Sequence, residues 1–256
     1  MIAREVFGSL SLLFWSFQLV PQIWKMHREK SAEGVSELMM LIWVVSCALY
    51  AAYAVALDLA VTLVIQPELF ILFAIICHGQ CLYYGRQTAT ACAMLATTAV
   101  CAGLQIGSIY GIEAANRKSL TGVVTMMGIV PAVLMDIGFF PQYWEVWTTK
   151  SAHGISYGFL VMDTFGASFA ILSLVFHDHF DPIAAATYIS VLALDLTLLL
   201  VKIALALRDR AKLRREATCY DGKQTKELSI APVITESTIV VRMGASDREK
   251  EAAGWV

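Results

Sequence analysis

Long apolar runs separated by short polar breaks occupy most of the chain. Seven runs can be drawn, over about residues 5–26, 36–57, 64–84, 88–110, 124–147, 155–176 and 183–207. A helix of about 20 residues crosses the ~30 Å hydrocarbon core of a bilayer. The pattern therefore predicts an all-α polytopic membrane protein with seven transmembrane helices. From Arg208 onward the chain is charged and mixed, which predicts a flexible tail over 208–256.

Two of these apolar runs end in the same motif, 120 residues apart. The first copy reads PQIWKMHREKSAEGVS from Pro21 to Ser36, and the second reads PQYWEVWTTKSAHGIS from Pro141 to Ser156. Eight of the sixteen positions are identical without a gap. A duplicated unit embedded in apolar helices is typical of transporters built from structural repeats.

The positions of the two motifs predict how the helices are grouped. They fall on the first and fifth predicted helices, which must run in the same direction because four crossings separate them. The seven helices then divide into parallel repeats in a 3+1+3 arrangement. We expect a first three-helix bundle over 1–85, a linker helix and loop over 86–123, and a second three-helix bundle over 124–207.

Lysine and arginine are distributed unevenly over the predicted loops. With the amino terminus outside the cytosol, only Arg4, Arg117 and Lys118 fall on the non-cytosolic side. Cytosolic loops usually carry the excess of positive charge. We therefore expect a luminal or extracellular amino terminus and a cytosolic carboxyl tail. The residues on the cytosolic side are then Lys25, Arg28, Lys30, Arg86, Lys150, Arg208, Arg210, Lys212, Arg214 and Arg215.

The repeated residues have properties suited to a hinge or gate. A proline inside a helix removes a backbone donor and bends or breaks the helix, so Pro21 and Pro141 predict matching kinks. The amides of Gln22 and Gln142 can hydrogen-bond freed carbonyls or reach across the bundle. Downstream, the repeated glycines permit a tight entry into the next helix, and Ser36 and Ser156 are candidate caps. The simpler alternative, mere helix-end punctuation, explains two copies in register less well.

Three aspartates, Asp136, Asp163 and Asp195, lie inside the predicted helices of the second half. A charged side chain at mid-bilayer costs about 2.5–3.5 kcal/mol on insertion scales, so such residues usually face a bundle interior and serve an ion or substrate path. Because burial disfavours a charged carboxylate, these groups are candidates for binding and releasing protons. The alternative is a structural hydrogen bond to a neighbouring helix.

The first half offers uncharged polar and aromatic side chains instead. We expect a possible substrate cavity to be lined by Gln18, Trp43, Ser46, His78 and Gln80. Halves that are alike in pattern and unlike in charge suit a site in which one wall binds a cation or proton and the other completes the cavity.

Composition narrows the function classes. Hydrophobic residues make up 58% of the 256 positions and charged residues 16%, whereas soluble domains have about 45–50% and about 25%. The net charge of -2 and the absence of a basic stripe give no sign of nucleic-acid binding. No phosphate-binding glycine loop, nucleophile elbow or zinc-protease motif is present, so we expect no enzyme. The cysteines show no metal-ligand spacing, and we expect neither a metal nor another cofactor.

The paired motif resembles the PQ-loop repeat family of seven-helix membrane proteins. That family includes the lysosomal cystine exporter cystinosin, lysosomal and vacuolar cationic amino acid exporters and, more distantly, the SWEET sugar transporters. The resemblance covers about residues 5–210. The second half looks most like cystinosin, through Phe140-Pro141-Gln142, Asp163 within Met162–Phe169, and Asp195 in the last helix. The first half, through Ser31–Ser36 and Gln80–Tyr84, looks more like the cationic amino acid exporters.

The resemblance implies proton-coupled export from an acidic lumen, with Asp163 and Asp195 as the coupling acids. It also implies a vacuolar or lysosomal membrane. This chain departs from the family pattern in the first half. The cationic exporters carry an acid in the second helix, where Ser46-Cys47 stands here, and another in the third helix, near Ala74. Cystinosin has asparagine at the position of Trp43. These departures leave the substrate open.

Two functions follow as hypotheses. The leading one is a proton-coupled transporter that moves a small cationic or zwitterionic amino acid from lumen to cytosol by alternating access. The alternative is a non-transporting nutrient sensor, receptor or recruitment scaffold, with a cytosolic partner for the tail. A lipid scramblase or sugar carrier is a third reading, and the three acids argue against a sugar site.

Overall fold

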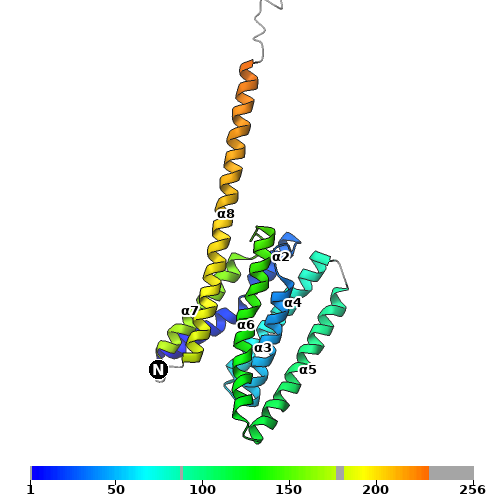
Figure 1. The fold of residues 1–256 in the computed structure, drawn as a ribbon, viewed down its shortest axis with the longest axis vertical. Coiled ribbons are helices and arrows are strands. Elements are labelled where there is room, and N and C mark those ends of the chain that lie inside the picture. Colours follow the sequence, from blue (N-terminus) through cyan, green and yellow to red (C-terminus); the bar gives the residue numbers. More distant parts are fainter. Residues whose placement is uncertain (1, 87–88, 177–181, 231–256) are drawn as a thin grey trace, which may run out of the picture. The chain divides into compact units, whose positions relative to one another are not determined.

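The structure, a computed structural model, describes residues 2–86, 89–176 and 182–230, which form helices and no strand. The chain divides into two compact units, residues 1–206 and 207–256. Figure 1 shows the helices in chain order. They are α1 (Ile2–Phe17), α2 (Val20–Glu29), α3 (Glu37–Ala56), α4 (Val61–Cys81) with the short π-helix η1 (Leu82–Arg86), α5 (Thr90–Arg117), α6 (Thr121–Thr149), α7 (Tyr157–Val175) and α8 (Pro182–Ile230).

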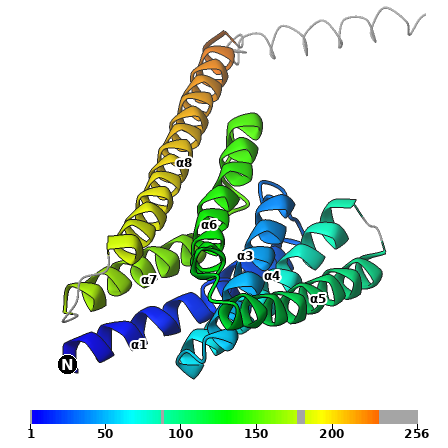
Figure 2. The same ribbon diagram turned by 60° about the horizontal axis from the view of Figure 1, so that its bottom comes forward.

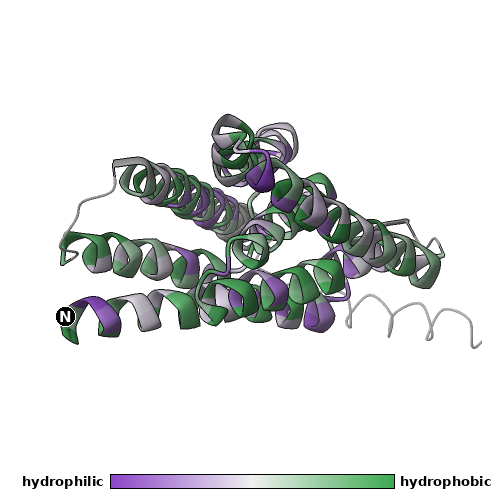
Figure 3. Cartoon of the chain, turned by 90° about the horizontal axis from the view of Figure 1, so that it is seen from below, coloured by the Kyte–Doolittle hydropathy of each residue, from purple (hydrophilic) through white to green (hydrophobic). Residues whose placement is uncertain are grey.

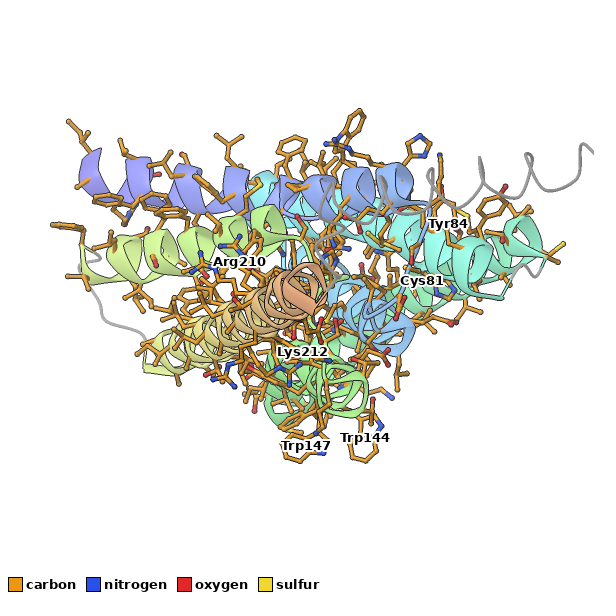
Figure 4. All side chains as sticks on the ribbon, turned by 90° about the horizontal axis from the view of Figure 1, so that it is seen from above. Cys81, Tyr84, Trp144, Trp147, Arg210 and Lys212 are labelled. Carbon is orange, nitrogen blue, oxygen red and sulfur yellow. The ribbon has the colours of Figure 1, made fainter. Side chains whose placement is uncertain are left out.

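Seven helical segments of the described chain are long and apolar enough to cross a membrane, which confirms the predicted all-α class and number of spans. The helices α1 and α2 together form the first segment, and α4 with η1 forms the third. Figure 3 colours long stretches of the helices as hydrophobic, with hydrophilic residues between them. Trp144 and Trp147 project outward from α6 in Figure 4 and are 68% and 69% exposed, as in the aromatic belts of membrane interfaces.

Two boundaries differ from the sequence-based expectation. The polar loop expected over 111–123 shrinks to a three-residue turn between α5 and α6, in which Ser119 has φ 53°. The expected tail from Arg208 continues as helix α8 to Ile230. Both stretches are polar yet rich in alanine, glutamate, lysine and arginine, which are good helix formers. Polarity ended the predicted spans there, whereas backbone propensity extends the helices.

Within the unit formed by residues 1–206, the central element is α3, which packs against α4, α5 and α6. Its Trp43 is fully buried, and the ring contacts Phe70, Phe139 and Phe159 at centroid distances of 5.7, 5.2 and 5.9 Å. Those three rings come from α4, α6 and α7, so the Trp43 side chain joins helices of both sequence halves.

A second contact between the halves pairs α1 with α7, which lie side by side in Figures 1 and 2. Phenylalanine rings line this contact: Phe7 stacks on Phe169 and Phe176, and Phe14 lies against Phe165 and Phe169. Hence α1 pairs with α7 as α3 pairs with α6, and each pair combines the first helix of one half with the next helix of the other.

The two prolines expected to kink their helices behave differently. The first span breaks at Gln18 and Leu19, and Pro21 lies in the first turn of α2, where its missing N–H has no intrahelical partner to lose. In the second half, α6 remains a helix through both Pro131 and Pro141. The matching motifs therefore sit on one broken span and one continuous span.

Candidate functional site

The repeated glutamines cross between the two halves. Gln22 Nε2 donates to the carbonyl oxygen of Gly154 at 3.0 Å, and Gln22 Oε1 accepts from the amide of Ser156 at 2.6 Å. Gln142 repeats both contacts on the opposite loop, donating to Gly34 O at 2.9 Å and accepting from Ser36 N at 2.9 Å. We call residues 31–36 and 151–156 the two PQ loops. Each glutamine thus binds the PQ loop of the other half.

Both glutamine side chains are fully buried, at 1% and 0% exposure. A buried amide without hydrogen bonds is costly, and each glutamine here uses one donor and its acceptor on loop backbone that α-helical bonding leaves unpaired. The caps expected at Ser36 and Ser156 are confirmed, because their Oγ atoms accept from the amides of Met39 and Gly158. Each of these two serines thus caps a helix through its Oγ and donates its backbone N–H to a glutamine of the other half.

Glycine allows the two PQ loops to touch. Gly34 has φ 77°, in the left-handed region that favours glycine. A Cβ built on Gly154 would lie 1.8 Å from the carbonyl oxygen of Glu33, closer than any real contact. The repeated glycines therefore serve loop-to-loop packing as well as the predicted tight entry into the next helix.

Two lysines add charged donors to the second PQ loop only. Lys25 of α2 donates through Nζ to His153 O, and Lys202 of α8 donates to Ala152 O at 2.7 Å. Lys202 is only 5% exposed and lies over the ring of Tyr157, with Nζ 4.2 Å from the centroid. Lys202 thus has a loop carbonyl and an aromatic face as partners.

Asp163 and Asp195 form a buried carboxyl pair. They are 3% and 0% exposed, and their side chains interact directly. Trp15 Nε1 donates to Asp163 Oδ1 at 2.9 Å. Neither oxygen of Asp195 receives a hydrogen bond from an N–H or hydroxyl donor among the described residues. A hydrogen bond between two carboxyl groups requires a proton on one of them, and two adjacent carboxylates in a medium of low dielectric constant cannot both be charged. Two carboxyl groups placed together in this way can share one proton.

The surroundings of the pair show an exchange of roles between the halves. Positions 15 and 163 correspond, by the 120-residue offset, to positions 135 and 43. In one half Trp15 donates to the Asp163 carboxyl, and in the other Trp43 donates to Met135 O at 3.0 Å. Each indole lies on a glycine, Gly166 and Gly138, where a Cβ would come within 2.5 and 2.4 Å of the ring. Asp163 thus stands at the position that Trp43 has in the first half.

Asp136 lies apart from that pair. Its Oδ2 accepts from Ser190 Oγ of α8 at 2.8 Å, and its Oδ1 is buried with no hydrogen-bond partner. The side chain is half-buried, and its carboxyl oxygens point inward between α6 and α8. Of the three predicted acids, the structure brings two together and places the third on a separate contact.

The predicted cavity residues of the first half are scattered, and all but the half-buried Gln80 are buried. Ser46 donates to Pro131 O at 2.6 Å, and Gln80 donates to Ile23 O at 3.2 Å. His78 lies 3.8 Å from Glu37 at the end of α4 nearest the PQ loops. Gln18, at the helix break, has its Oε1 buried without a partner. Together with the core position of Trp43, these contacts give the residues mainly helix-to-helix bonding, and the structure does not gather them into one cavity.

Four functional contacts were not predicted from the sequence. They involve Trp15, Lys25, Tyr143 and Ser190. Trp15 and Lys25 carry a usable signal, because each stands near the Pro-Gln motif with a different residue at the equivalent position of the second copy. Tyr143 carries the same signal, because the first copy has Ile23 at the equivalent position. Ser190 carries none, because a serine in an apolar helix often bonds the backbone of its own helix.

Comparison with known proteins identifies both repeats. The PQ loop repeat matches residues 3–62 and 123–183. An uncharacterised protein of Schizosaccharomyces pombe is 38% identical over 189 residues, which cover 73% of this chain and 66% of that protein. Two Saccharomyces cerevisiae proteins, the vacuolar histidine transporter YPQ3 and the vacuolar lysine transporter YPQ1, are 31% and 32% identical over 80 residues.

The extent of these matches differs. The chain spans just under two thirds of the fission yeast relative, and the 80-residue matches cover 31% of this chain and 27% and 26% of the two vacuolar transporters. The two matched repeats contain the glutamines that bind each other's loops, and the second also contains Asp163. With two repeats matched and related PQ-loop transporters found, the chain belongs to the PQ-loop repeat family.

Proposed function

We propose that this protein is a proton-coupled transporter that exports a small cationic or zwitterionic amino acid from an acidic lumen to the cytosol. The observation that carries the proposal is the burial of Asp163 and Asp195 side by side, because two neighbouring carboxyl groups away from water can share a proton. Its similarity to vacuolar histidine and lysine transporters supports the amino acid as substrate class. The same similarity supports a vacuolar membrane or its lysosomal counterpart. The distribution of lysine and arginine supports a luminal amino terminus.

In this proposal the two PQ loops form the cytosolic gate. The present conformation holds them together through four glutamine hydrogen bonds and the lysine contacts of Lys25 and Lys202. Opening toward the cytosol requires these bonds to separate. The two three-helix repeats would then move relative to each other about the break at Gln18 and about Pro141.

The proton and the gate are linked through short stretches of helix. Asp195 precedes Lys202 by seven residues, about 10 Å along α8, and Asp163 follows the Ser156 cap by seven residues on α7. Adding or removing a charge at the pair changes the electrostatic cost of burying it between these two helices. We call the four hydrogen bonds of Gln22 and Gln142 with the PQ loops the clamp. Helix α7 begins in the loop bound by Gln22, so movement of α7 would directly change the geometry of the clamp.

The test is uptake by proteoliposomes that contain the full chain, with a panel of amino acids and with or without a pH gradient. We expect proton-driven uptake of histidine, lysine or a similar amino acid. Asp163→Asn and Asp195→Asn should each lower proton-driven uptake at least tenfold, whereas Glu113→Gln, an exposed acid on α5, should leave it unchanged. Unchanged rate and unchanged pH dependence in Asp163→Asn would refute the proton role.

A second candidate function is a nutrient sensor, receptor or recruitment scaffold. The observation that favours it is the exposed, charged helical stretch between Arg208 and Thr218, whose described side chains all face solvent. Deleting residues 211–256 separates the candidates. Uptake that survives the deletion supports the transporter, whereas intact membrane insertion with lost recruitment of a cytosolic protein supports the scaffold.

A further inference from the structure

Asp136 is an acid within an apolar helix, and it is not part of the Asp163–Asp195 pair. It lies on α6, and among the described residues its side chain hydrogen-bonds with Ser190 Oγ alone, at 2.8 Å. Its second oxygen, Oδ1, is buried and unpaired. A charged carboxylate in this position would leave an acceptor unsatisfied inside the bundle, which proteins rarely tolerate.

The Ser190 hydroxyl reveals which form of Asp136 fits the contacts. Ser190 Oγ lies 2.8 Å from Asp136 Oδ2 and also 2.8 Å from the carbonyl oxygen of Thr187. A hydroxyl group has one proton to donate and lone pairs with which to accept. If Ser190 donates to Thr187 O, the contact with Asp136 is a hydrogen bond only when Asp136 carries the proton and donates it to Ser190. A protonated Asp136 therefore satisfies both contacts at once.

The neighbouring elements supply no opposite charge. Among the described residues, no lysine, arginine or histidine lies within ion-pair distance of Asp136. On α3, Tyr53 packs against Gly128, two turns before Asp136, and Tyr50 interacts with Tyr188, two residues before Ser190 on α8. Helix α5 carries Glu113 and Arg117 at the end that turns into α6.

On α8, the acid closest to this contact is Asp195, five residues beyond Ser190. Tyr143 OH also donates to Leu194 O at 2.6 Å. Contacts between positions 136 and 190 and between 143 and 194 show that α6 and α8 run in the same direction. Asp136 therefore lies about 7.5 Å from the level of Asp195 along the helix axes, on the side away from the PQ loops.

We propose that Asp136 and Ser190 form a second proton-binding centre, separate from the Asp163–Asp195 pair and placed on the side of it remote from the PQ loops. The proton binds a carboxylate oxygen of Asp136 and is donated to Ser190 Oγ, while Ser190 donates to Thr187 O. In the transport cycle, which rests on the proposed function above, a proton from the lumen meets Asp136 before it meets the pair. The chain can then carry one proton at each centre.

Infrared spectroscopy of the purified full chain tests the centre without any transport. At pH 7 a protonated carboxyl group gives its own carbonyl stretching band. We expect Asp136→Asn, whose side-chain NH2 still offers a donor to Ser190 Oγ, to remove one such band and leave that of the pair. Ser190→Ala should keep the band and move it to higher frequency, because the carboxyl group loses its acceptor. An Asp136→Asn spectrum that retains every protonated-carboxyl band would overturn the proposal.

Proton counting in proteoliposomes tests the coupling separately. We expect Asp136→Asn to lower the number of protons moved per substrate by about one, while Asp163→Asn abolishes proton-driven uptake. Loss of the infrared band together with unchanged proton counting would overturn the role of Asp136 in the cycle. If no amino acid is transported by the unmodified chain, the proposed function fails, and the infrared result still decides whether Asp136 holds a proton.

Discussion

At the scale of single residues, Gln22 and Gln142 are the groups that make the duplicated motif a contact between halves. Each amide pairs one donor and one acceptor with backbone atoms two residues apart on the opposite PQ loop. A glutamine amide offers both functions at this spacing, and a carboxylate offers only acceptors. The identity of the side chain is therefore dictated by the backbone that it binds.

Gln22→Glu should weaken the clamp on one side only. The carboxylate still accepts from Ser156 N–H, but it faces Gly154 O with no donor, so a buried carbonyl loses its partner. We expect a loss of about 1–3 kcal/mol of stability, measured as a lower temperature of unfolding in detergent. Gln66→Glu, at a half-buried position near the end of α4 remote from the PQ loops, is the control. An equal shift in both variants would show that the clamp contributes no special stability.

Gly154→Ala should be far more damaging than an ordinary glycine substitution. The new Cβ would lie 1.8 Å from Glu33 O, so the PQ loops must separate. Gly122→Ala is the matched control, since a Cβ there meets nothing within 4 Å. We expect lower yield of folded monomer and a lower unfolding temperature for Gly154→Ala alone. Two variants of equal stability would contradict the loop contact.

At the scale of helices, the halves interlock through two pairs, α1 with α7 and α3 with α6. Each pair contains one indole that lies over a glycine of the partner helix and donates to it, Trp15 over Gly166 and Trp43 over Gly138. By the 120-residue offset, the position of Trp15 corresponds to Met135 and the position of Trp43 corresponds to Asp163, so donor and acceptor exchange helices between the two pairs. The packing of indole on glycine is thus repeated, but the acceptor of the indole N–H differs. It is the carboxyl group of Asp163 in the α1–α7 pair and a backbone carbonyl oxygen in the α3–α6 pair.

Filling the space beneath an indole should separate a helix pair. Gly138→Ala and Gly166→Ala place a Cβ 2.4 and 2.5 Å from the rings of Trp43 and Trp15. Overpacking of this kind costs about 1–3 kcal/mol, which an unfolding curve in detergent can measure. Gly103→Ala on α5, where a Cβ meets nothing within 4 Å, is the control. If all three variants unfold alike, close indole-to-glycine packing is not a feature of the protein in its membrane.

At the scale of the whole molecule, the PQ loops of both halves meet at one end of the unit formed by residues 1–206. The clamp bonds, the two lysine contacts and the contact of Gly34 with Gly154 all lie there. The turn between α5 and α6 belongs to the other end of its helices. This arrangement requires both PQ loops to face one compartment, as the distribution of lysine and arginine predicts.

Single-cysteine labelling with a membrane-impermeant reagent measures that topology. In sealed vesicles, Ser31→Cys and Ser151→Cys should be labelled from the same side, which we expect to be cytosolic. Ser119→Cys, in the turn between α5 and α6, should be labelled only from the opposite side. Labelling of the two PQ loops from different sides would contradict parallel repeats, and labelling of all three from one side would contradict the crossing of α5 and α6.

The sequence by itself determined the elements and the motif. Twenty-residue apolar runs fix the number of spans because lipid demands helices of that length, and the repeated Pro-Gln motif is visible without any structure. Helix ends were predicted less well at 111–123 and after Arg208, since polarity marks the edge of the membrane and backbone propensity marks the end of a helix. The presence of Asp163 and Asp195 in apolar helices was also evident, because intramembrane acids are rare.

Only the tertiary structure decided which residues meet. Asp163 and Asp195 stand 32 positions apart and Asp136 is closer to Asp163 in sequence, yet Asp195 is the partner and Asp136 bonds to Ser190. Likewise, no local pattern shows that Gln22 binds the loop 132 residues away. Periodicity along one helix specifies which face is apolar, but the partner of a buried polar group depends on how separate helices pack, and that information lies in the fold.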